Sequence, residues 1–289
     1  MLFSGEHCFL SLVSSSGDQI TVGPPWFNNI MIPIGLALLL LTGAGPLLAW
    51  RHTSVETLKR SFGWPTLGAI VFIAVLFASG VRDGWALGSF AISFFVMWTI
   101  VVEFVKGANI RRRNSGENFF LAMYMLSRKN TRRYGGYMIH AAMVVMFVGF
   151  TGNVFNSETR AEVGEGDSFQ LGPYTFNAIK IIEDENENYS SQTLEMEMYR
   201  NGRLIDRISP QKRFYFASEQ PSTEVDIYST IREDIYAVLS GMSNDGTKVI
   251  VQVYRNPFVS MVWIGAFILG IGTLFAMLPN LRESKVGGE

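Results

Sequence analysis

Two ionisable side chains lie inside stretches that are long and apolar enough to cross a membrane. His140 lies in an apolar run that follows Arg133, and Glu103 lies near the end of the preceding run. An ionisable group inside a hydrocarbon layer is costly, so each is a functional candidate by default. Both are predicted at the same level of the membrane, near its cytoplasmic face.

The chemistry open to His140 is that of a haem ligand. A neutral imidazole can bind iron through one nitrogen while a hydrogen bond orients the other. Gly136 lies one helical turn before His140 on the same face, which would leave space for a flat macrocycle. The alternative is a histidine that hydrogen-bonds between helices. For Glu103 the alternative is a carboxylate paired with Lys106 or a nearby arginine. Spacing alone leaves both alternatives open.

The elements that would position these residues are membrane-spanning helices. The 289 residues are 48% hydrophobic, more than a soluble domain needs. A hydrocarbon core of about 30 Å takes about 20 helical residues. Five stretches satisfy this, approximately Ile30 to Trp50, Trp64 to Val81, Trp85 to Val105, Tyr137 to Phe155 and Phe258 to Leu278.

Charge separates sharply along the chain and predicts its orientation. Between residues 106 and 133, eight basic side chains face a single acid, Glu117, whereas residues 154–256 carry seventeen acids and ten bases. Basic loops stay on the cytoplasmic side. Residues 106–136 are therefore predicted inside and residues 156–257 outside. We interpret the basic loop as a topology signal rather than a nucleic-acid or anionic-substrate site, and no nucleic-acid partner is expected.

The outer segment is predicted to be rich in β-strands. Runs such as Tyr174 to Ile182, Thr193 to Tyr199 and Lys248 to Tyr254 are rich in β-branched and aromatic residues. Asn201 and Gly202 predict a type I′ hairpin, and Asn244 to Gly246 predict another turn.

The predicted fold class is thus an α-helical polytopic membrane protein, with about five transmembrane helices and an extracytoplasmic β-rich domain. The expected domains are an extracytoplasmic segment (1–29), a four-helix membrane region (30–155), an acidic β-rich domain (156–257), and a fifth helix with a cytoplasmic tail (258–289).

Several kinds of chemistry are excluded by what the sequence lacks. The sole cysteine, Cys8, cannot form an intrachain disulfide or a CxxC pair. No GxGxxG, P-loop, HExxH or GxSxG arrangement stands where its chemistry would need it. His7 and His52 are predicted near loops on opposite membrane faces. The chain therefore has no self-sufficient catalytic constellation.

Longer strings resemble a known family. The string Ile20 to Asn28, followed by Gly45 to Arg51, resembles the C-terminal half of CcmF, the membrane haem lyase of cytochrome c maturation. Arg133 to Tyr137 and His140 continue the resemblance. It extends through Gly164 to Asp167, Lys212, Arg213, Tyr215, Asp234 to Tyr236 and Tyr254 to Phe258.

The resemblance implies a function, a cofactor and partners. Members of the family attach haem to the CxxCH motifs of apocytochrome c outside the cytoplasm, in the bacterial inner membrane. They receive haem from the chaperone CcmE and work with CcmH and CcmI type partners. By resemblance, His140 is one of two transmembrane histidines that hold a haem b, with Gly136 packed beside it.

The chain also departs from the family pattern. It lacks the tryptophan-rich WWD segment, the two outward-facing histidines and the other transmembrane histidine that the family carries upstream. Residues 1–18 do not resemble the transmembrane helix expected there. We therefore expect a split subunit, a truncated product or a fragment, inactive as an enzyme without a WWD-containing N-terminal partner that supplies the second axial ligand.

The leading hypothesis is a haem-handling subunit of such a lyase. The alternative is a non-catalytic membrane scaffold that docks other maturation factors through its acidic outer domain. A small-solute transporter fits poorly, because it would need more polar residues at the midplane or broken helices in paired halves.

Overall fold

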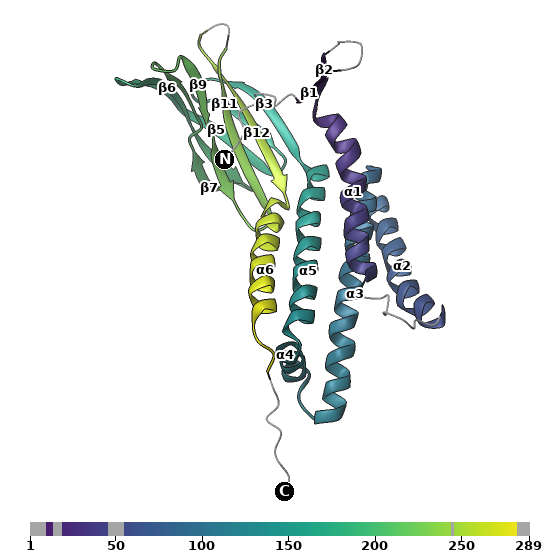
Figure 1. Ribbon diagram of the computed structural model, residues 1–289. Helices are drawn as coiled ribbons and strands as arrows, with labels where there is room; N and C mark the ends of the chain where they lie inside the picture. Colours follow the sequence, from purple (N-terminus) through teal and green to yellow (C-terminus); the bar gives the residue numbers. More distant parts are fainter. Residues whose placement is uncertain (1–9, 14–18, 46–54, 244–245, 282–289) are drawn as a thin grey trace. The chain divides into compact units, whose positions relative to one another are not determined.

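The computed structural model describes residues 10–13, 19–45, 55–243 and 246–281 (Figure 1). The described chain divides into two compact units. The β unit comprises residues 155–260. The membrane unit comprises the described residues up to Val154 and from Met261 onward.

Five helices in the described part of the chain are long and apolar enough to cross a membrane. This confirms the predicted polytopic architecture. The helices are α1 (Pro24–Ala44), α2 (Val55–Ala78), α3 (Gly84–Ser115), α5 (Thr131–Thr151) and α6 (Val259–Met277).

Helix α3 is the centre of the membrane unit and packs against α1, α2 and α5. Small residues permit close approach, which in lipid favours helix association. A Cβ atom added at Gly43 of α1 would lie 2.7 Å from the Val96 side chain of α3. One added at Gly265 of α6 would lie 2.8 Å from the Ala142 carbonyl oxygen of α5. Glycine therefore sets the spacing of both helix pairs.

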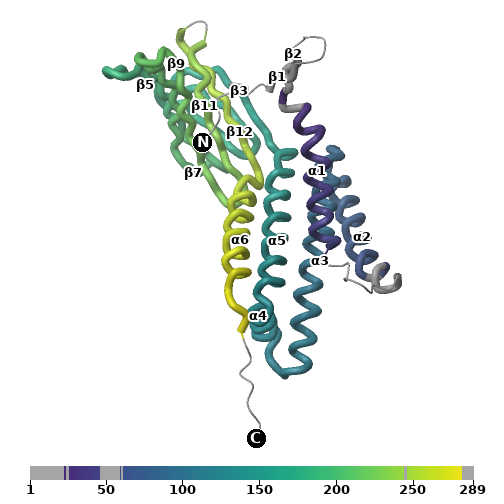
Figure 2. Tube along the Cα trace, in the orientation of Figure 1, coloured from purple at the N-terminus to yellow at the C-terminus, as the bar shows by residue number. Residues whose placement is uncertain are grey.

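The structure differs from the predicted helix boundaries in ways that have local causes. Helix α1 begins at Pro24 rather than Ile30, because proline suits the first helical turn. Helix α3 continues past Val105 to Ser115, where Gly116 takes a left-handed conformation. The trace then turns into an unpredicted short helix, α4 (Phe119–Lys129) (Figure 2). Two unpredicted strands, β1 (Leu10–Val13) and β2 (Gln19–Val22), pair near the N-terminus.

The β unit is a sandwich of two antiparallel sheets, which confirms the predicted β-rich domain. One sheet has the order β10-β11-β12-β3, and the other has the order β4-β5-β6-β8-β9 with β7 also paired to β6. The strands are β3 (Ser157–Val163), β4 (Ser168–Leu171), β5 (Tyr174–Glu185), β6 (Tyr189–Arg200), β7 (Arg203–Ile208), β8 (Gln211–Tyr215), β9 (Gln220–Glu224), β10 (Asp226–Ser229), β11 (Glu233–Met242) and β12 (Val249–Pro257).

Alternation along the strands builds the core between the sheets. Phe176 and Leu194 from one sheet and Leu239 and Val251 from the other are fully buried. The β6–β7 turn is the predicted hairpin, since Asn201 and Gly202 have φ of 51° and 75° and lie between paired Arg200 and Arg203. In the second predicted turn, Asn244 and Asp245 lie outside the described residues.

Candidate functional site

Helix α5 carries His140 on a side that does not face α6. Gly135 and Ala142 pack against α6. Tyr137 and Val144 belong to the core cluster shared with α3. At 3.6 residues per turn, His140 lies roughly 150° around the helix from the α6 contact. Its side chain is half-buried.

The imidazole of His140 has a polar atom without a partner. Its Nδ1 atom is buried and has no hydrogen-bond partner among the described residues. A buried, unsatisfied polar atom costs about 1–3 kcal/mol, so one in a native structure calls for an explanation. The alternative of a hydrogen bond between helices thus finds no support in the described part of the chain.

Space beside His140 is also present. A Cβ atom added at Gly136 would meet nothing within 4 Å, whereas one added at the adjacent Gly135 would lie 2.6 Å from the Cβ of Ala276. The two neighbouring glycines therefore serve different purposes. Gly135 permits helix packing, and Gly136 leaves open space one turn from the imidazole. An unpaired ring nitrogen beside open space fits an axial haem ligand.

Glu103 pairs with an arginine of α5 rather than with Lys106. The Arg133 Nη2 atom lies 2.9 Å from the Glu103 carboxylate, and Arg133 Nε donates to the Tyr137 hydroxyl at 3.1 Å. The pair joins α3 to α5 two turns from His140. Glu103 is therefore an ion-pair partner in the structure, as one of its sequence-based alternatives proposed. His7 and His52 lie outside the described residues.

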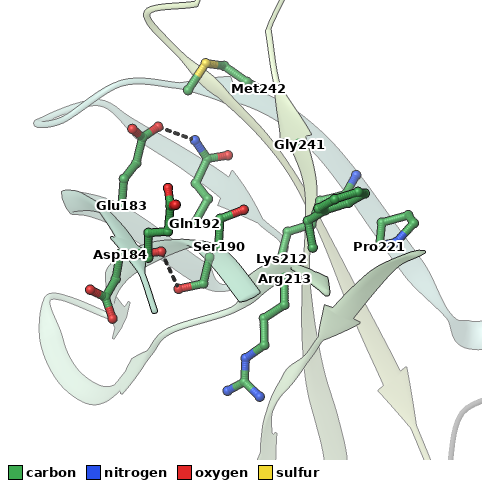
Figure 3. Close-up of a pocket in the computed structure, with 12 residues that line it drawn as sticks. Glu183, Asp184, Ser190, Gln192, Lys212, Arg213, Pro221, Gly241 and Met242 are labelled. Carbon is green, nitrogen blue, oxygen red and sulfur yellow. Dashed lines mark hydrogen bonds between the residues drawn. The ribbon is translucent and has the colours of Figure 1, made fainter. Parts of the chain in front are cut away.

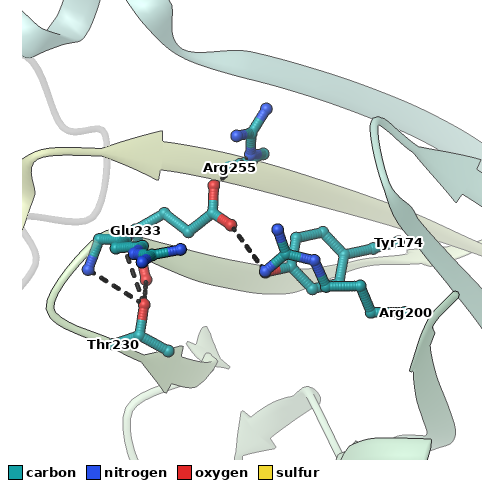
Figure 4. A network of polar contacts seen from close by, with 6 residues as sticks. Tyr174, Arg200, Thr230, Glu233 and Arg255 are labelled. Carbon is teal, nitrogen blue, oxygen red and sulfur yellow. Dashed lines mark hydrogen bonds and ion pairs between the residues drawn. The ribbon is translucent and has the colours of Figure 1, made fainter. Parts of the chain in front are cut away.

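The β unit contains a buried carboxylate that sequence reasoning did not single out (Figure 4). Glu233 of β11 is 5% exposed and accepts a hydrogen bond from the Tyr174 hydroxyl at 2.7 Å. Arg255 of β12 donates to the other carboxylate oxygen, Oε2. Arg200 Nη1 lies 3.7 Å from Oε1, the oxygen that accepts from Tyr174. Thr230 Oγ1 accepts from the Glu233 backbone N–H at 3.1 Å.

The neighbours of Glu233 determine its charge state. Burial raises the pKa of the Glu233 carboxyl, but the hydrogen bonds from Tyr174 and Arg255 and the charges of Arg255 and Arg200 together outweigh burial and hold the pKa below its ordinary value. Burial and the bond to Glu233 raise the pKa of Tyr174 to about 12. Glu233 is thus ionised and Tyr174 protonated at neutral pH, and their hydrogen bond joins the two sheets.

A cavity of about 550 Å³ opens between strands of both sheets (Figure 3). Glu183, Asp184, Lys212 and Arg213 are among the residues that line it. The Lys212 ammonium group donates to the Ser240 carbonyl, at the β-bulge of β11. The Arg213 guanidinium lies 4.9 Å from the centre of the Tyr189 ring. Lys212 and Arg213 therefore make contacts within the β-sandwich.

Comparison with known proteins shows what this arrangement resembles. Residues 154–257 match a family model described as the CcmF C-terminal beta-sandwich. A cytochrome c-type biogenesis protein CcmF from Pseudomonas aeruginosa is 27% identical over 99% of the chain, and one from Escherichia coli K12 is 25% identical over 94%. The chain is therefore similar to CcmF proteins over nearly its whole length.

A solved structure shows the same fold. The cytochrome c haem lyase CcmF matches 89% of the chain with a TM-score of 0.67 at 18% identity. The chain spans 42% and 40% of the lengths of the Pseudomonas and Escherichia CcmF proteins and 41% of the solved chain. It therefore corresponds to the C-terminal part of CcmF and is a multi-pass membrane protein.

Sequence reasoning anticipated some of these structural features and missed others. His140 and Gly136 lie on one side of α5, as their spacing predicted. The Glu233 network was missed because its members come from β5, β6, β11 and β12, and no local spacing brings them together. The pair between Arg111 and Glu117 had one signal, since Glu117 is the only acid in the basic loop.

Proposed function

We propose that this chain is the haem-handling C-terminal part of a CcmF-type haem lyase. The observation that carries the proposal is the unpaired imidazole nitrogen of His140 beside the open space at Gly136. The similarity to CcmF proteins, one of which is named a haem lyase, supports haem handling as the task. The comparisons do not favour a docking scaffold without such a task.

In this proposal His140 is one of two axial ligands of a haem b. The imidazole would bind the iron through one nitrogen, and Gly136 would leave space for the macrocycle. His7 and His52 are expected near loops on opposite faces of the membrane, so in this proposal the second ligand comes from the WWD-containing N-terminal half of CcmF or its equivalent, and His52 is the alternative within the chain. Bound haem b would supply a one-electron couple.

The reaction served would be thioether formation between haem vinyl groups and the cysteine thiols of CxxCH motifs, which needs reduced iron. The proposed partners are the haem chaperone CcmE, CcmH and CcmI type proteins, and apocytochrome c. The proposed location is the bacterial inner membrane. The chain by itself is not expected to catalyse the attachment.

The proposal is tested by expressing the chain alone and together with a WWD-containing N-terminal partner. The isolated chain should hold little or no stable haem b, because one side chain provides one axial bond. The pair should show a low-spin reduced spectrum after membrane extraction and should attach haem covalently to a CxxCH reporter. A pair that forms a complex without haem b or covalent attachment would favour the scaffold instead.

The orientation of the chain gives a second prediction. Reporter fusions after Lys129 should report a cytoplasmic position and fusions after Asn188 an extracytoplasmic one, because the basic residues cluster near the first site and the acidic residues near the second. Paired phosphatase and fluorescent-protein fusions measure both positions. The opposite pattern at either site would overturn the proposed orientation.

A further inference from the structure

The end of the membrane unit formed by α3, α4 and α5 has features that a topology signal does not require. A cavity of about 490 Å³ opens there between the three helices. Arg111 and Arg133 line it, together with the polar residues Asn114 and Ser115. Ile110 and Leu126 add apolar surface. The cavity therefore joins basic, polar and apolar surface in one place.

The cavity is built by a close helix contact. A Cβ atom added at Gly107 would lie 2.6 Å from both the Leu126 side chain and the Tyr134 hydroxyl oxygen. Tyr134 is 3% exposed and packs 5.0 Å from the ring of Phe104. The base of the cavity is thus formed by packed side chains of α3, α4 and α5, and Arg111 and Arg133 line the cavity.

Each cavity arginine is oriented by a carboxylate and keeps donors for another anion. Arg111 binds Glu117 through Nε and Nη2, both at 2.7 Å. Arg133 uses Nη2 for Glu103 and Nε for Tyr137. A guanidinium has five N–H donors in a planar fork. The Nη1 group of each arginine has no hydrogen-bond partner among the described residues and is left for an oxyanion.

The length of α3 places the cavity at the level of the lipid headgroups. The 32 residues of α3 make a helix about 48 Å long, against a hydrocarbon core of about 30 Å. Its last turns, which include Arg111, therefore extend to the headgroup layer and beyond. Beside them, α4 exposes apolar side chains, with Phe120 72% and Tyr124 55% exposed. Such a helix lies in the membrane interface.

From these observations we propose that the cavity between α3, α4 and α5 binds the phosphate of an anionic phospholipid headgroup. Arg111 and Arg133 hold the phosphate, Asn114 contacts the polar headgroup, and Ile110 contacts the start of the acyl chains. Basic pockets between transmembrane helices bind anionic headgroups in this way. The binding is independent of haem and of the N-terminal partner.

Native mass spectrometry of the full chain in neutral detergent tests the proposal. Phosphatidylglycerol and phosphatidylcholine with the same acyl chains are the probes. We expect a phosphatidylglycerol molecule to be retained in preference to phosphatidylcholine, and Arg111→Gln to reduce that preference about fivefold. Asn114→Glu, which places a carboxylate at the cavity without removing an ion pair, should reduce it at least as much.

One matched variant serves as the control. Arg203→Gln removes one positive charge from an exposed position of the β unit and should retain the wild-type preference. Equal retention of the two lipids, or an unchanged preference in Asn114→Glu, would overturn the proposal. So would full displacement of the lipid by inorganic phosphate, since the site would then bind a free anion.

Discussion

Replacing His140 with alanine is expected to abolish the haem b spectrum of the chain co-expressed with its WWD-containing partner. The imidazole provides one of two axial bonds, and no other histidine lies among the described residues to replace it. Cytochrome c assembly in the same cells should fall with it. The measurement is the reduced visible spectrum of the extracted pair, scaled to the amount of protein.

A second histidine substitution tests the assignment from the other direction. His52 lies outside the described residues and is the alternative partner within the chain. If the second ligand comes from another polypeptide, His52→Ala should leave the spectrum intact. A normal haem b spectrum and normal cytochrome c assembly in His140→Ala would refute the ligand assignment and leave the histidine with a structural role.

Substitutions at the adjacent Gly135 and Gly136 should distinguish loss of space for haem from loss of helix packing. Gly136→Leu should lower haem occupancy, because its branched side chain would enter open space one turn from His140. Gly136→Ala should leave helix packing unchanged. Gly135→Ala should destabilise the α5–α6 pair instead, since its Cβ would lie 2.6 Å from that of Ala276. Equal loss of thermal stability in Gly136→Leu and Gly135→Ala would mean that haem loss reflects disrupted packing.

These outcomes depend on features that the sequence reveals unevenly. Hydropathy predicted the five spans because a helix in lipid must satisfy its backbone hydrogen bonds internally. The hairpin at Asn201 and Gly202 was predictable because its turn needs positive φ at both residues. Local pattern also placed His140 and Gly136 on one helix side. All three depend on residues near one another in sequence.

Features that join distant segments were not predictable in this way. Arg133 and Glu103 pair across α3 and α5, thirty residues apart. Tyr174 and Glu233 are separated by 59 residues and meet only because β5 and β11 lie in facing sheets of the sandwich. Helix α4 has only eleven residues, too short to be recognised as a span. Its position depends on packing against Gly107 of α3.

The Glu233 network carries the second large prediction. Glu233→Ala should lower the local stability of β11 and β12 by about 2–3 kcal/mol, because it leaves the Tyr174 hydroxyl and the Arg255 guanidinium without their acceptor. Hydrogen–deuterium exchange of these strands in the full chain should accelerate roughly thirtyfold or more. Glu224→Ala is the control, because its pair with Arg213 is 3.7 Å long and Glu224 is 45% exposed.

The difference in hydrogen–deuterium exchange between the wild-type chain and Glu233→Ala should depend on pH, and the pKa shifts of Glu233 and Tyr174 predict how. The Glu233 pKa is lower in the folded chain, so its stabilisation is complete above the unfolded value, about 4.3, and is lost as the pH falls through the folded pKa. The Tyr174 pKa is raised to about 12, so its contribution is present below about 10 and is lost between about 10 and 12. The difference in exchange between wild type and Glu233→Ala should therefore be largest between about pH 5 and 10 and shrink on both sides. A constant difference at every pH would show that Glu233 stabilises the strands by packing alone.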